Sequence, residues 1–194
     1  MKTLFIAAVA VASISFSACN GNNNSAKENN TTGDTAAMQT PESGTEMKGT
    51  GTPIKELTAA YIQIKNGLTS DNGNDAAAGG KAFNEALAKV DKSSMSAEQK
   101  KSFEDIADDA KEMAEHISTN AGKIEHQREH FDMLSKDMYD VVKTFGAGQT
   151  LYQDFCPMYN DNKGATWLSE TKEIKNPYMG KKQPACGSMK EELK

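Results

Sequence analysis

Residues 96–117 read SAEQKKSFEDIADDAKEMAEHI, and this stretch decides the fold class. Ser96, followed three residues later by Gln99, forms a capping-box pattern that marks the first turn of a helix. The apolar positions after it are spaced by three and four residues, which places them on one helical face. They are Phe103, Ile106, Ala110, Met113 and Ile117. The sequence therefore predicts an amphipathic helix that buries one side.

Three further stretches show the same helical spacing. Their inward positions are Leu57, Tyr61, Ile64 and Leu68; Phe83, Leu87 and Val90; and Ile124, Phe131, Leu134, Met138, Val141 and Phe145. Pro53 fits the first turn of the first helix, and the glycines at 146 and 148 end the last one. Gly79 and Gly80 weaken the start of the helix expected over about residues 75–90. Four amphipathic helices with short connections predict an up-and-down four-helix bundle.

The character of the sequence changes after Gly148. Residues 151–155 alternate between apolar and polar, residues 160–164 favour a turn, and residues 165–168 read as a returning strand. We expect a β-hairpin, followed by an irregular tail to Lys194. Because a lone hairpin is barely stable in water, both must pack on the helices. The predicted fold is therefore all-α, with a C-terminal hairpin and tail.

The N-terminus indicates export. The apolar run from Leu4 to Phe16 is about 13 residues long, too short for a bilayer crossing of roughly 20. Ser17 and Ala18 then precede Cys19, which resembles the lipobox of a bacterial lipoprotein. We expect residues 1–18 to be a cleaved signal peptide, with lipid attached to Cys19. The alternative is an ordinary secretory signal beside a chance cysteine.

The region that follows Cys19 predicts a tether. Residues 19–53 are rich in Asn, Thr, Gly, Ser and Glu, and such a composition cannot bury enough apolar surface to fold. The folded domain is then residues 54–194. The expected location is the cell envelope, facing the periplasm and on the outer membrane, with the lipid as the only membrane contact. A net charge of −5 argues against nucleic acid as a partner.

Soft metal donors gather in the second half of the chain. On helices these are His116, His126, His130 and Met133, and outside helices they are Cys156, Met158, Met179, Cys186 and Met189. Thiolate and thioether ligands favour Cu(I), and imidazole extends the set to Cu(II) or zinc. His126 and His130 lie four apart on one helical face, and Cys156 and Met158 lie two apart on one strand face. We expect Cys156 and Met158 to be the principal ligands.

Each of these donors has a structural alternative. Met113 and Met138 occupy core positions, where methionine usually packs. Cys156 and Cys186 could instead form a disulfide that closes a loop of about 30 residues. The two histidines could lie on a solvated helix face.

One motif favours an enzyme. Residues 126–130 read HQREH, which fits the H-x-x-E-H pattern of certain zinc peptidases. Such enzymes need a third protein ligand from another element and a substrate cleft, for which a small bundle leaves little room. We therefore expect no catalytic residues and no enzymatic activity.

Several separated motifs carry a family resemblance. They are HQREHF at 126–131, FCPM at 155–158, WLS at 167–169, IKNPY at 174–178 and CG at 186–187. Together they resemble the Bacteroidetes periplasmic family called domain of unknown function 3347, over about residues 54–194. Members of that family occur as lipoproteins or fused to CusB-like adaptors of heavy-metal efflux pumps, and they are associated with copper.

The resemblance implies one metal site. Its ligands would be His126, His130, Cys156, Met158 and Cys186. The chain departs from the family pattern at two positions, because Met179 replaces a phenylalanine and Gln183 replaces a methionine.

The expected function follows from this site. The protein would bind copper, preferably as Cu(I) and with zinc possible, to buffer it or pass it to an efflux adaptor or pump. The rival is an interaction module without metal, stabilised by a Cys156–Cys186 disulfide. Sulfur atoms about 2 Å apart would favour the rival, and separate thiols that face His126 or His130 would favour metal.

Overall fold

A computed structural model describes residues 52–194, most of which are helical. The four long helices are α1 (Thr52–Thr69), α2 (Gly73–Leu87), α3 (Ala97–Thr119) and α4 (Ile124–Phe145). The C-terminal part contains β1 (Leu151–Cys156), α5 (Tyr159–Asn162), β2 (Ala165–Ser169), η1 (Gly180–Lys182) and β3 (Ser188–Leu193). The predicted signal peptide, lipidated Cys19 and the tether up to residue 51 lie outside the described residues, whereas the last two tether residues, Thr52 and Pro53, begin α1. Within residues 52–194, no helix is both long and apolar enough to cross a membrane.

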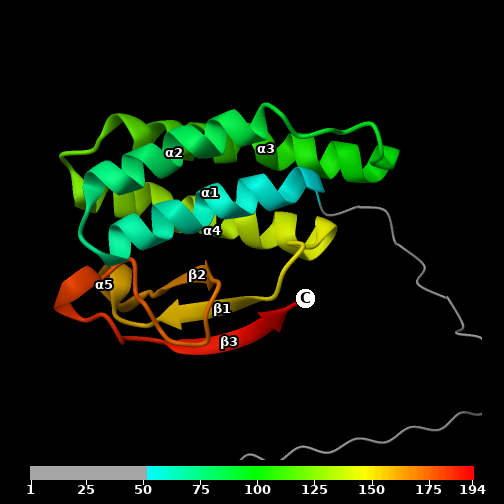
Figure 1. Cartoon of the computed structure of the whole chain (residues 1–194). Coiled ribbons are helices and arrows are strands. Elements are labelled where there is room, and N and C mark those ends of the chain that lie inside the picture. Colours follow the sequence, from blue (N-terminus) through cyan, green and yellow to red (C-terminus); the bar gives the residue numbers. More distant parts are fainter. Residues whose placement is uncertain (1–51) are drawn as a thin grey trace, which may run out of the picture. The chain divides into compact units, whose positions relative to one another are not determined.

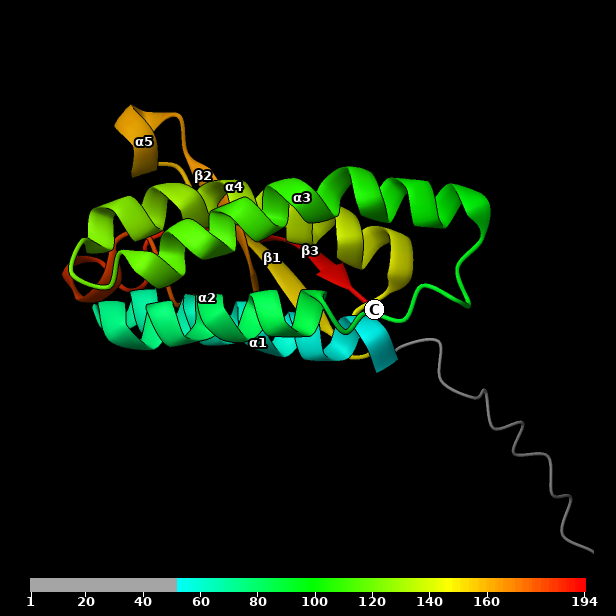
Figure 2. The same ribbon diagram turned by 90° about the horizontal axis from the view of Figure 1, so that it is seen from above.

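The helices and the sheet form layers (Figures 1 and 2). α2 and α3 lie on one side of α1 and α4, and the sheet lies on the other side. Consecutive helices pack against each other, α1 also contacts α4, and β2 packs on α4. The predominantly helical character expected from the sequence is confirmed. The up-and-down order of the bundle stays a prediction.

The capping box that begins α3 is present. The Ser96 hydroxyl accepts a hydrogen bond from the Gln99 amide at 3.2 Å, and the Gln99 side chain accepts one from the Ser96 amide at 3.0 Å. These two bonds satisfy backbone donors that a helix start leaves free. Phe103 and Ile117 are buried as the spacing predicts, whereas Met113 is only partly buried.

Gly79 and Gly80 explain how α2 packs so closely. A Cβ atom on Gly79 would lie 2.7 Å from the Ile64 amide nitrogen of α1, and one on Gly80 would lie 2.7 Å from the Ala114 carbonyl oxygen of α3. These glycines lower the helix propensity of α2, but they let its backbone approach two neighbours.

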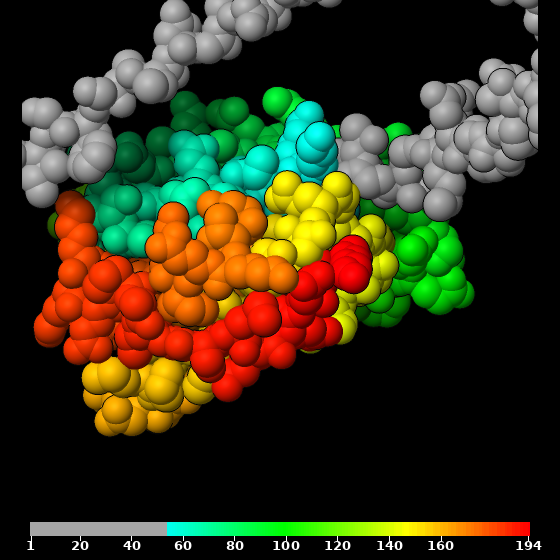
Figure 3. Space-filling view, turned by 60° about the horizontal axis from the view of Figure 1, so that its bottom comes forward, coloured from blue at the N-terminus to red at the C-terminus, as the bar shows by residue number. Residues whose placement is uncertain are grey.

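The C-terminal sheet has three antiparallel strands in the order β2-β1-β3. The predicted hairpin corresponds to β1 and β2, whose register pairs Asp154 with Trp167. The prediction of an irregular tail to Lys194 was wrong, because residues 188–193 form β3 and pair with β1. β3 is an edge strand in which only Leu193 is buried. An exposed strand of this kind needs no alternation of apolar and polar residues, and the sequence of β3 shows none. Figure 3 shows the C-terminal residues covering the face of the domain opposite α2 and α3.

Buried polar groups attach the C-terminal part to the helices. The Tyr61 hydroxyl of α1 lies 2.8 Å from the Ser135 hydroxyl of α4, and it accepts a hydrogen bond from the Leu168 amide of β2 at 3.0 Å. Lys65, fully buried on α1, pairs with Glu170 at 2.7 Å. These bonds orient the sheet on α1 and α4, because buried polar groups need specific partners.

Asp154 of β1 is an exception among these buried groups. Its side chain is fully buried, and neither carboxylate oxygen has a hydrogen-bond partner within residues 52–194. Burial raises the pKa of Asp154 to about 7, and nearby Lys65 opposes that shift. Below about pH 7 the folded state therefore holds Asp154 mainly as the neutral carboxylic acid.

Candidate metal centre

Three histidines meet where α3 turns into α4. His126 and His130 lie one turn apart on α4, and His116 lies near the end of α3. Each offers a ring nitrogen, and these three atoms all lie within 4.8 Å of one another. Gln127 holds the two helices together at this level, because its side-chain amide donates to the Ile117 carbonyl oxygen at 2.9 Å.

The imidazole rings are in direct contact. The rings of His116 and His130 stack with centroids 4.1 Å apart and planes 10° apart. The Nε2 atoms of His126 and His130 lie 3.1 Å apart. Two nitrogen ligands of a tetrahedral metal, with bonds of about 2.05 Å, lie roughly 3.3 Å apart. The two α4 histidines are therefore already close to the spacing of a chelating pair.

The far side of each α4 imidazole also has a partner. His126 Nδ1 lies 3.4 Å from Glu129 Oε2, and His130 Nδ1 lies 3.3 Å from Met113 Sδ. A histidine that donates its Nδ1–H to such a group presents the Nε2 lone pair for a metal. If both Nδ1 atoms are protonated, the Nε2 lone pairs of His126 and His130 face each other at 3.1 Å. Their repulsion is relieved only by a proton shared between them or by a bound cation.

The surroundings of His130, burial first and neighbouring imidazoles second, favour its neutral form. Partial burial lowers the pKa of His130, and the neighbouring His116 and His126 lower it further, against the opposing effect of Glu129 and Glu112. A neutral imidazole is the form that binds metal. His130 therefore stays available as a ligand at a lower pH than an exposed histidine would.

Comparison with known proteins bears on this helical part. Residues 57–150 match the model of a family described as "Protein of unknown function (DUF3347)". This match supports the resemblance to the DUF3347 family that the sequence motifs indicated. No curated protein and no solved structure matches the chain. The region matched to DUF3347 contains the three histidines and Met113, and it ends before Cys156.

The cysteines lie elsewhere. Cys156 ends β1, Cys186 precedes β3, and their sulfur atoms are 3.3 Å apart as free thiols. Neither sulfur joins the histidine cluster. A hydrogen bond with Cys156 and partial burial raise the pKa of Cys186. The cysteines therefore form neither a disulfide nor a shared site with the histidines. Their sulfurs are not at bonding distance, and they do not converge on His126 or His130.

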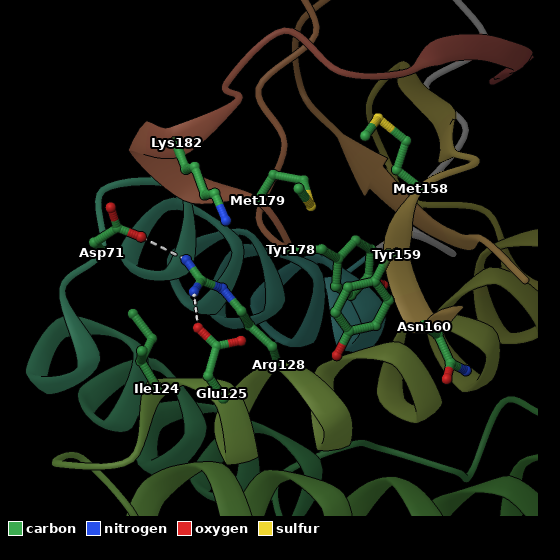
Figure 4. Close-up of a pocket in the computed structure, with 10 residues that line it drawn as sticks. All are labelled: Asp71, Ile124, Glu125, Arg128, Met158, Tyr159, Asn160, Tyr178, Met179 and Lys182. Atoms are coloured by element: carbon green, nitrogen blue, oxygen red, sulfur yellow. Dashed lines mark hydrogen bonds and ion pairs between the residues drawn. The ribbon is translucent and has the colours of Figure 1, made fainter. Parts of the chain in front are cut away.

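The other predicted sulfur donors lie in two pockets and on β3. Met158 and Met179 line a pocket of about 450 Å³ between the start of α4 and the C-terminal part (Figure 4). Met133 lines a neighbouring pocket of about 370 Å³ with Glu129, and Met189 lies exposed on β3. The single site expected from the sequence is therefore divided, and the roles of these sulfurs as ligands stay predictions.

Two contributors were undervalued by sequence reasoning. His116 was a weaker candidate, and Met113 was assigned to the core, yet both contact His130. The sequence held a usable signal, because the apolar pattern of one helix ends at Ile117 and that of the next begins at Ile124. Residues just before and just after so short a connection face each other when two helices pack side by side.

Proposed function

We propose that this protein binds copper through His116, His126 and His130. The observation that carries the proposal is the arrangement of the two α4 imidazoles, whose Nε2 atoms face each other at 3.1 Å while their Nδ1 atoms contact Glu129 and Met113. This resembles metal sites in which an outer partner holds each histidine in the metal-binding tautomer. His116 would complete a three-imidazole set from the other helix.

Copper is the metal that this donor set favours. Imidazole suits copper and zinc, and Cu(II) binds more tightly than Zn(II) at a given nitrogen site. Three neutral ligands also suit the single charge of Cu(I). The sequence favoured Cu(I) because it offered cysteine and methionine sulfur as ligands. A site made of imidazoles suits Cu(I) and Cu(II) alike, so we propose both.

The exposure of the site suits buffering or transfer. The side chain of His116 is 42% exposed and that of His126 is 37% exposed, so a partner protein could reach the metal and exchange ligands. We propose an envelope lipoprotein, attached through Cys19, that holds copper on an up-and-down helical bundle. It would buffer the metal or pass it to an efflux adaptor or pump.

A competition titration tests this function. The full chain is titrated anaerobically with Cu(I) against a chromophoric chelator, and separately with Cu(II) and Zn(II). His130→Asn should lower copper affinity by more than the roughly 10–100-fold that loss of an outer partner costs. Met133→Leu is the matched control, because it removes an exposed soft donor from the same helix outside the cluster. Equal affinities for the parent and His130→Asn would contradict the proposal.

A zinc hydrolase is the second candidate, and His116 is the observation that favours it. This residue supplies the third imidazole that the H-x-x-E-H pattern requires from another element. Glu129, however, contacts His126 through Nδ1, on the side away from the facing Nε2 atoms. A general base must reach the metal-bound water. We therefore expect no peptide hydrolysis by the zinc-loaded protein, and hydrolysis that Glu129→Gln abolishes would favour the enzyme.

A further inference from the structure

The cysteine pair occupies a rigid position that metal binding at the histidines does not use. Cys156 is the last residue of β1 and is fully buried, whereas Cys186 is partly exposed. The register of β1 with β3 pairs Phe155 with Ser188, which brings Cys186, two residues before β3, next to Cys156 at the end of β1. Their sulfur atoms are held 3.3 Å apart.

The backbone around Cys186 is held against the sheet. Asn176 donates from its side-chain amide to the Cys186 carbonyl oxygen at 2.6 Å, and the Cys186 amide donates to the Gln183 carbonyl oxygen at 3.2 Å. Gly187 has a positive φ of 140°, and a Cβ atom there would lie 2.9 Å from the Phe155 carbonyl oxygen. Cys186 therefore has little freedom to leave Cys156.

We propose that Cys156 and Cys186 are a reversible dithiol–disulfide pair that reacts with a disulfide-donor protein. A disulfide requires the sulfurs to approach from 3.3 Å to about 2.05 Å. Rotation of the partly exposed Cys186 side chain supplies that movement without displacing a strand. The inference stands apart from the proposed copper site, because neither sulfur belongs to the histidine cluster.

The different exposures set the order of the chemistry. The thiolate of Cys186 attacks one donor sulfur, forming a mixed disulfide and releasing one donor thiolate. The thiolate of Cys156 then attacks Cys186 Sγ, which forms the internal disulfide and releases the second donor thiolate. The two protons pass to the donor sulfurs, and the two electrons lost by the pair reduce the donor to a dithiol. A reducing dithiol reverses both steps.

Formation of the disulfide would stabilise residues 157–185, the segment between the two cysteines that contacts α4. The loop between the cysteines contains β2 and the Asn176–Tyr178 turn, whose Pro177 carbonyl oxygen accepts a hydrogen bond from Arg128 Nε of α4 at 2.8 Å. A cross-link at the base of this loop limits the unfolded chain most strongly in that region. Reduction would instead leave the segment attached by noncovalent contacts alone, among them the ion pair between Lys65 and Glu170.

The test uses the full chain with Cys19→Ser, which removes the third thiol. The reduced protein is incubated with the oxidised form of a dithiol–disulfide exchange protein, then alkylated and weighed. We expect a loss of two hydrogens, no alkylation, no covalent dimer, and a melting temperature higher by roughly 10 °C. Dithiothreitol should restore both thiols and the original melting temperature. Cys186→Ser is the control that cannot close.

Three results would overturn the proposal. One is a stable mixed disulfide at Cys186 without internal closure, and another is closure that leaves the melting temperature unchanged. The third is protection of both thiols from alkylation by one equivalent of Cu(I) in a chain that also lacks the three histidines. That last result would assign the pair to metal instead. Disulfide formation between Cys156 and Cys186 in the chain without the three histidines would support the dithiol–disulfide proposal, even if copper binding by the histidines were disproved.

Discussion

Arg128 offers a quantitative test of how the C-terminal part is attached. It lies on α4 between the candidate ligands His126 and His130, and its side chain is only 5% exposed. Its Nε donates to the Pro177 carbonyl oxygen at 2.8 Å, and its Nη2 donates to the Leu68 carbonyl oxygen at 3.1 Å. It also pairs with Asp71 and Glu125. Arg128→Met keeps an apolar stem and removes all four interactions.

The size of the loss follows from the exposure of each partner. The two carbonyl bonds are buried, and a hydrogen bond from a charged group contributes about 1.5–3 kcal/mol. Glu125 is 76% exposed and Asp71 is 37% exposed, so each ion pair adds at most about 1 kcal/mol. We expect Arg128→Met to lower the free energy of unfolding by about 3–5 kcal/mol. This corresponds to a fall in melting temperature of roughly 10–15 °C.

Urea and thermal unfolding, followed by circular dichroism, measure this change. Lys136→Met is the matched control, because Lys136 is a 62% exposed cation on the same helix with one ion pair to Asp132. It should change the free energy of unfolding by less than about 1 kcal/mol. A loss in Arg128→Met no larger than that of the control would refute the view that Arg128 fastens the loop to α4.

Three further predictions concern separate parts of the chain. Cys19→Ser should move the protein from the membrane fraction to the soluble fraction, and retention after a high-salt wash would count against lipidation. Deleting residues 20–51 from a soluble form should leave the melting temperature unchanged, because that segment holds no apolar periodicity, and a fall of several degrees would show a role in folding. Asp154 has a raised folded-state pKa of about 7, so the parent should lose stability as pH rises from about 4 to 7. Asp154→Asn should remove that loss, and a difference in melting temperature that stays constant across these pH values would be inconsistent with a buried titrating carboxyl group.

The helical part of the fold was predictable because each helix buries one face. Phe103, Ile117 and Phe131 recur at helical spacing, and the Ser96 box marks a start that the structure confirms. β3 was not predictable in the same way, because an edge strand can be polar along its length when its neighbour supplies the hydrogen bonds. Only Leu193 of β3 is buried.

The candidate site was predictable only in part, for a related reason. His126 and His130 share one helix, so their spacing alone places them together. His116 joins them through helix packing, and that contact depends on how the connection after α3 turns. The expectation that Cys156 and Met158 share a strand face was wrong, because β1 ends at Cys156 and Met158 lies beyond it, just before α5. Cys156 is buried whereas Met158 is exposed.

The most direct test of the account is X-ray absorption spectroscopy at the copper edge on the full chain loaded with one equivalent of copper. If His116, His126 and His130 hold the metal, the nearest shell should contain nitrogen at about 2.0 Å with imidazole outer-shell scattering, and no sulfur at about 2.3 Å. Cys156→Ser and Cys186→Ser together should leave that spectrum unchanged. A dominant sulfur shell that disappears in the double cysteine variant would contradict the histidine site and move the metal to the end of β1.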